Sequence, residues 1–90
     1  MNKELEIIGN DLNERETYLL EHQRYIKSNI LTLNNFELLH EYAEAVKRRK
    51  YYVVENNENP LCTKKAQQIV FETYDIIMHE ALRRMGEFDK

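Results

Sequence analysis

Two pairs of carboxylates at helical spacing are the residues of this 90-residue chain best suited to chemistry. Glu41 and Glu44 lie three positions apart, and so do Glu72 and Asp75 later in the chain. Residues three apart share one face of a helix, so each pair would present its carboxylates together. If the two helices were antiparallel neighbours, all four groups could converge. Carboxylate oxygens suit Mg²⁺, which leaves room for the phosphates of a substrate.

The spacing resembles the motif of the MazG-like all-α nucleotide pyrophosphohydrolases, which is Glu-Glu-x-x-Glu, a spacer, and then Glu-x-x-Asp. Here HEYAE runs from His40 to Glu44, 27 residues follow, and ETYD runs from Glu72 to Asp75. The DIIMHEALRRMG stretch that includes this aspartate resembles the same family's helix. The resemblance implies that the four carboxylates bind Mg²⁺ and that a nucleoside triphosphate loses pyrophosphate. His40 replaces the first glutamate of the motif, and the first 33 residues have no counterpart in it.

A solvated helix face would show the same carboxylates, because acidic residues near a helix N-terminus stabilise the helix dipole. We adopt this interpretation, so the chain is predicted to be non-enzymatic rather than an enzyme, and no catalytic residue is assigned. No cofactor is expected, and Mg²⁺ belongs only to the pyrophosphohydrolase alternative.

A basic run, KRRK, could bind the phosphates of a nucleic acid, and the two tyrosines after it could stack on bases. The same cations also suit the C-terminal end of a helix, and the net charge is −3, which is not typical of a general nucleic-acid binder. Association with nucleic acid is therefore the second alternative. The residues of the run are Lys47, Arg48, Arg49 and Lys50.

The basic run closes a stretch that has every sign of a helix. Asn34 precedes Glu37 by three residues, which is the spacing of a capping box. Apolar residues follow at three- and four-residue steps, and the charge order from acidic to basic complements the helix dipole. We predict a helix over residues 35–55 and expect the rest of the chain to be organised around it.

The first segment carries an apolar residue at every seventh position, which is half of a coiled-coil seam. We predict a helix over residues 2–32 whose apolar column faces a partner. Gly9, Asn10 and Asp11 are poor helix formers, so a start at Asp11 is the alternative. The predicted interface residues are Leu5, Leu12, Leu19, Ile26 and Leu33, widened by Tyr18 and Tyr25.

The last segment follows a breaker loop over residues 56–60 and is predicted to be a helix over 60–85. Asn59 and Pro60 suit its first positions, and Thr63 is a rival cap. Gly86 is the expected C-terminal stop. The apolar arc of this segment is wide, which indicates contact with more than one neighbour.

Composition bounds the fold class. Two glycines and one proline are too few for the turns of an all-β domain, and 90 residues make one domain at most. We therefore predict a single all-α domain over residues 1–90, either a three-helix antiparallel bundle or an extended helical hairpin. Helices of the predicted lengths leave a large surface for so little mass, so a dimer is expected.

The expected function is that of a small helical protein–protein interaction module, an adaptor or inhibitor, acting through an apolar helix face. Its partner would be a second copy or another protein. The single cysteine, Cys62, cannot form an internal disulfide, and no signal peptide or membrane-spanning run is apparent. A cytoplasmic protein of bacterial or phage origin is the expectation.

Overall fold

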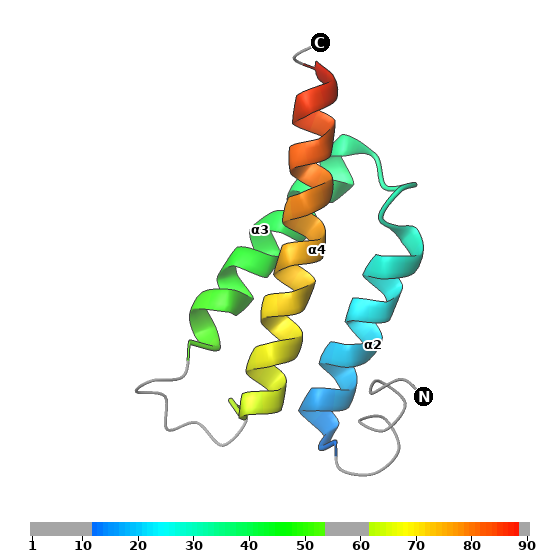
Figure 1. The fold of residues 1–90 in the computed structure, drawn as a ribbon. Coiled ribbons are helices and arrows are strands. Elements are labelled where there is room, and N and C mark those ends of the chain that lie inside the picture. The colour runs from blue at the N-terminus through cyan, green and yellow to red at the C-terminus, as the bar shows by residue number, and fades with distance from the viewer. Residues whose placement is uncertain (1–11, 54–61, 89–90) are drawn as a thin grey trace.

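The computed structural model describes residues 12–53 and 62–88, and these residues form three helices. They are α2 (Glu14–Asn29), α3 (Asn35–Tyr51) and α4 (Lys64–Phe88). No strand occurs in the described residues, so the prediction of an all-α fold is confirmed. None of these helices combines the length and apolar content that a membrane span requires. α2 and α4 run in the same direction and α3 runs opposite to both (Figure 1).

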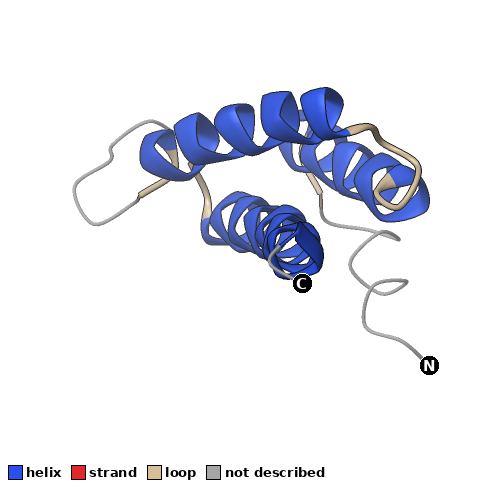
Figure 2. Cartoon of the chain, turned by 90° about the horizontal axis from the view of Figure 1, so that it is seen from above, coloured by secondary structure: helices blue, strands red, loops and turns tan. Residues whose placement is uncertain are grey.

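α4 is the helix around which the other two are arranged. It lies between α2 and α3 in Figure 1 and packs against both, whereas α2 and α3 have no comparable packing on each other. In the view from above, α4, which ends near the C label, lies on one side of the other two helices (Figure 2). The prediction that residues 35–55 form the central element is therefore wrong. The wide apolar arc of the last helix does serve two neighbours, as its pattern indicated.

Two clusters of buried side chains hold the helices together. The first combines Ile26 with Leu38, Ala45 and Ile77, and so joins all three helices. The second lies nearer the start of α2 and comprises Leu19, Leu20, Tyr52, Cys62, Ala66, Ile69 and Val70. The described part of the molecule is thin, because its three principal extents are 44, 33 and 18 Å.

The seven-residue apolar column of the first segment faces this internal core. Leu19 is 3% exposed and Ile26 is 0% exposed, while Leu12 and Leu33 are partly buried against the same clusters. The prediction that this column faces a partner is wrong for Leu19 and Ile26, because the core of the same chain covers them. For Leu12 and Leu33, which remain partly exposed, it stays a prediction. Leu5 lies outside the described residues.

α2 begins at Glu14, so the prediction of an unbroken helix from residue 2 is wrong at Asn13. The backbone of Asn13 is extended, its side chain accepts the N–H of Glu16 at 2.8 Å, and the Glu16 carboxylate accepts the N–H of Asn13 at 3.0 Å. This capping box fixes the start of the helix. The alternative start at Asp11 and the residues before it lie outside the described part. The helix ends at Asn29 rather than near 32, because a turn follows in which Asn29 O accepts from Thr32 N.

α3 has the predicted start and an earlier end. Asn34 and Glu37 form the expected capping box, with both hydrogen bonds 2.8 Å long. The helix stops at Tyr51, and Tyr52 leaves helical geometry while its N–H still reaches the carbonyl of Arg48 at 2.9 Å. The side chain of Tyr52 is buried in the second cluster at the point where the helix ends. Residues 54 and 55 of the predicted helix lie outside the described part.

Thr63, the alternative N-cap to Asn59, is the residue that caps the start of α4. Its hydroxyl oxygen accepts the N–H of Ala66 at 3.0 Å and donates its proton to the carboxylate of Glu16. One hydroxyl thus ties together the N-termini of the parallel helices α2 and α4. The predicted start at Pro60, which lies outside the described residues, is superseded by a start at Lys64. Gly86 lies inside the helix without positive φ, so the predicted stop is wrong and α4 continues to Phe88.

Replacing Thr63 with alanine should lower the free energy of unfolding by about 1–2 kcal/mol, since both a helix cap and a hydrogen bond to a carboxylate are lost. Urea denaturation followed by circular dichroism measures the change. Thr63→Ser is the matched control and should retain most of the stability. Equal losses in the two variants would contradict the role of the hydroxyl.

Candidate functional site

The two carboxylates that the sequence places on α3, Glu41 and Glu44, contact different neighbours. Glu41 Oε1 lies 3.5 Å from Nε2 of His22 on α2, and Glu44 Oε2 lies 3.5 Å from Nζ of Lys47 on its own helix. The first contact points into the junction of α2 and α3, and the second lies at the surface. The two carboxylates of this pair therefore have different neighbours.

The carboxylates predicted on α4 are directed toward a different neighbourhood. Glu72 accepts from the side-chain amide of Gln68 at 3.1 Å, and a longer contact of 3.5 Å joins it to Gln23 of α2. Asp75 is exposed beside Lys27 in a shallow hollow on the same side. Across residues 12–53 and 62–88, no three side chains of metal-ligating type come together to hold an ion. The convergence that a Mg²⁺ site would need is not present there.

The side chains of the basic run, residues 47–50, point toward different parts of the molecule. The Arg48 guanidinium lies 3.3 Å from the imidazole of His22, and the Arg49 guanidinium lies 5.0 Å from the ring centres of both Phe71 and Tyr74 on α4. Lys47 pairs with an acid of its own helix, and Lys50 is exposed. Cations that are consecutive in sequence thus have different neighbours, although Lys47, Arg49 and Lys50 all remain exposed.

Two tyrosines of the predicted interface remain half-exposed on α2. Tyr25 stacks on His22 with ring centres 6.3 Å apart, and Tyr18 lies under the guanidinium of Arg15 at 5.9 Å. Without the buried column beside them, they do not make a continuous apolar face. The candidate binding surface lies on another part of the molecule.

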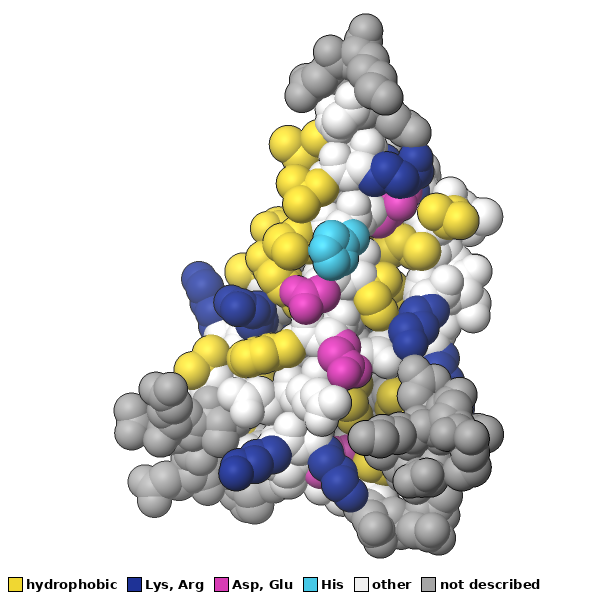
Figure 3. All heavy atoms as spheres, in the orientation of Figure 1, with side chains coloured by type: hydrophobic (Ala, Val, Ile, Leu, Met, Phe, Trp, Pro, Cys, Tyr) yellow, Lys and Arg dark blue, Asp and Glu magenta, His cyan; other side chains and the backbone are white. Residues whose placement is uncertain are grey.

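That surface is an apolar groove between the first half of α3 and the second half of α4, with a volume of about 410 Å³. Leu39, Leu82 and Met85 border it and are 63%, 53% and 59% exposed. Figure 3 shows apolar side chains gathered along α4 on the side that faces α3. The groove is lined by Asn35, Leu38, Leu39, Tyr42, Met78, Ala81, Leu82, Arg84 and Met85.

Sequence reasoning did not find this groove, although α4 carried a signal for it. The apolar arc of α4 was wide enough for two neighbours along its whole length. In the structure the last turns of α4 extend beyond α2 and α3 (Figure 1). The arc is therefore only partly covered, and the uncovered part becomes the groove.

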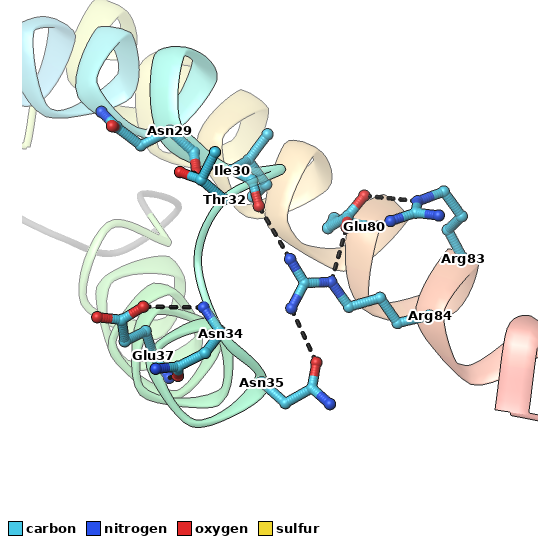
Figure 4. A network of polar contacts seen from close by, with 9 residues as sticks. All are labelled: Asn29, Ile30, Thr32, Asn34, Asn35, Glu37, Glu80, Arg83 and Arg84. Carbon is cyan, nitrogen blue, oxygen red and sulfur yellow. Dashed lines mark hydrogen bonds and ion pairs between the residues drawn. The ribbon is translucent and has the colours of Figure 1, made fainter.

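A polar network fixes one end of the groove (Figure 4). Arg84 donates from Nε to Glu80 at 2.7 Å, from Nη1 to Oδ1 of Asn35 at 2.8 Å, and from Nη2 to the carbonyl of Ile30 at 3.0 Å. One side chain of α4 thereby holds the connection between α2 and α3. The groove wall at Asn35 is positioned before any ligand binds.

Glu80 is the acceptor at the centre of that network and is only 7% exposed. Hydrogen bonds from Arg83, and then from Arg84, lower the pKa of Glu80 to about 2, although burial opposes the shift. The carboxylate therefore stays ionised over the whole physiological pH range. Its fixed charge orients both guanidinium groups.

Comparison with known proteins gave no match to this chain, whether it was made against family models, curated proteins or solved structures. Its function is therefore inferred from the residues of the site alone. The geometry offers an apolar groove with a fixed polar end, and the described residues hold no group of three or more side chains that could bind a metal ion.

Proposed function

We propose that the protein is a small non-enzymatic interaction module, an adaptor or inhibitor, which binds an apolar helix in the groove between α3 and α4. The observation that carries this proposal is the exposure of Leu39, Leu82 and Met85 around a groove whose end is already fixed by Arg84. Contiguous exposed apolar surface is a mark of interaction sites. A groove between two helices suits a third helix that carries apolar residues on one face.

A second copy of the chain is the occupant that the described surface favours. On α3, Phe36 and Leu39 lie three apart and exposed, and on α4 Leu82 and Met85 do the same. Such ridges are the anchors that a helix groove accepts, and a two-fold dimer places the same patch of each copy in contact. The layer is only 18 Å thick in its smallest extent, so a second layer would bury what one copy leaves exposed.

The two alternatives have less support. A Mg²⁺-dependent pyrophosphohydrolase needs its carboxylates in one place, and Glu41 lies beside His22 of α2 whereas Glu72 accepts from Gln68. A nucleic-acid interface needs several neighbouring cations directed at the ligand, and Arg48 instead contacts His22 while Arg49 lies over a ring of α4. The groove depends on neither group.

Replacing Leu39 with aspartate should weaken self-association at least about tenfold, since a charge would have to be buried at the centre of the interface. Light scattering on a size-exclusion column measures the mass. The wild type should show twice the 10.9 kDa of one chain, and the variant should show one chain at the same concentration. Leu31→Asp, at a residue that is 72% exposed and outside the groove, is the control and should remain dimeric.

A wild type of single-chain mass at millimolar concentration would overturn the second copy as occupant. A fluorescent apolar dye then tests the groove itself. Dye binding that is lost in Leu39→Asp but kept in Leu31→Asp would assign the groove to a helix of another protein. Equal dye binding in all three proteins would overturn the proposed function.

A further inference from the structure

His22 lies where the three helices meet, and its side chain is 19% exposed. A very small cavity of about 10 Å³ adjoins it, with Leu19 from its own helix, Ala45 and Arg48 from α3, and Val70 and Thr73 from α4 around it. α2 and α3 each pack mainly against α4. A polar contact made directly between α2 and α3 therefore adds a link that their own packing does not supply. The imidazole of His22 makes that contact.

One nitrogen of His22 faces two partners that it cannot satisfy at the same time. Nε2 lies 3.3 Å from Nη1 of Arg48 and 3.5 Å from Oε1 of Glu41. A neutral imidazole with its proton on Nδ1 accepts from the guanidinium through Nε2. A protonated imidazole carries hydrogen on both nitrogens, so Nε2 can then only donate, and its acceptor is the carboxylate.

The surroundings of His22 set which state prevails. Burial lowers the pKa of His22 below its ordinary 6.5, the positive charge of Arg48 lowers it further, and Glu41 partly opposes both. α4 contributes Val70 and Thr73 at this junction, which do not titrate, and Tyr25 stacks on the ring from α2 itself. The neutral form therefore prevails at neutral pH, and its tautomer with the proton on Nδ1 accepts from Arg48.

We propose that His22 is a proton-controlled latch between α2 and α3: the neutral imidazole holds Arg48, and the protonated imidazole holds Glu41 and expels Arg48 from the helix junction. Arg48 and Glu41 are seven residues apart on α3, which is two turns along one face. The exchange therefore moves the contact of His22 from one turn of α3 to another. Expulsion of the guanidinium also removes one wall of the cavity beside Leu19 and Ala45.

Protonation of His22 should also change the free energy of unfolding. The folded-state pKa of His22 is lowered, so its contribution to stability is present above the unfolded value of 6.5 and is lost as the pH falls through the folded value. Acidification should therefore loosen the contact between α2 and α3 while α4 still holds each of them.

A residue-resolved NMR titration from about pH 8 to about pH 5 tests the latch in the full chain. The imidazole signals of His22 should titrate below 6.5, and the side-chain Nε–H of Arg48 and the amide of Ala45 should follow with the same midpoint. Glu41→Gln should lower the midpoint of His22 and Arg48→Gln should raise it, each by at least about 0.5 unit. Opposite shifts are the signature of a nitrogen shared between the two partners.

Two further variants provide the controls. His22→Gln should abolish the pH dependence of the Arg48 and Ala45 signals, whereas His40→Gln, at an exposed position on α3, should leave it intact. If a variant fails to fold, the wild-type titration still decides. The proposal is overturned if the Arg48 and Ala45 signals do not follow His22, or if neither partner variant moves its midpoint, because His22 would then only fill space between the helices.

Discussion

Arg84→Ala should lower the free energy of unfolding by about 3 kcal/mol, as expected when one member of a buried ion pair is removed. The Arg84 side chain is 13% exposed and its partner Glu80 is 7% exposed. Truncation also leaves Asn35 and the carbonyl of Ile30 without the guanidinium that joins them to α4. Urea denaturation followed by circular dichroism measures the loss.

The neighbouring residue Arg83 provides a matched control. It donates to the same carboxylate at 2.7 Å, but its side chain is 49% exposed. A pair between residues three apart at the surface contributes little, so Arg83→Ala should cost no more than about 1 kcal/mol. If the two alanine variants lost equal stability, the link from Arg84 to the α2–α3 connection would have no energetic weight.

Acid unfolding gives a second measurement of the same network. Because the folded-state pKa of Glu80 is lowered from 4.5 to about 2, its stabilising contribution is complete above 4.5 and is lost as the pH falls toward 2. Arg84→Ala removes one of the two hydrogen-bonding partners that lower this pKa. The variant should therefore lose less of its remaining stability across that pH range than the wild type does.

Local signals in the sequence predict local structure well. The Asn-x-x-Glu pattern at Asn34 predicts a capping box that the structure contains. The same pattern stands at Asn13 and Glu16, but an apolar column at seven-residue spacing continues through it and favours one unbroken helix. A cap is a hydrogen-bonding arrangement within four residues, so it can be found from sequence alone. Periodicity carries no comparable information on where a helix begins.

Long-range relationships are the part that the sequence does not determine. The column through Leu19 and Ile26 indicates a buried face correctly, but spacing cannot tell whether another helix of the same chain or a second copy covers it. The carboxylate pairs have the same ambiguity, since each shares a helix face whether or not the two faces meet. The groove depends on how far the end of α4 extends past the start of α3, which only the packing of complete side chains decides.

Ile26→Ala should be more damaging than any of the other truncations, with a loss of about 3–4 kcal/mol. Ile26 is 0% exposed and packs with Leu38 and Ile77, so it joins α2 to both other helices and leaves a cavity that cannot collapse easily. A domain of this size has a total stability of roughly 5–13 kcal/mol, of which this loss is a substantial share. Leu31→Ala, at a residue that is 72% exposed, should change stability by no more than about 0.5 kcal/mol.

The same variant separates an internal core from an interface between copies. A side chain buried by its own chain stabilises each molecule independently, so the loss caused by Ile26→Ala should be equal at low and high protein concentration. A side chain buried by a second copy acts through mass action, and its loss would grow with concentration. Urea denaturation of Ile26→Ala and wild type at two widely separated protein concentrations makes the distinction. A concentration-dependent loss would show that a second copy buries this face of α2. It would then remove the reason for assigning the dimer interface to the groove between α3 and α4.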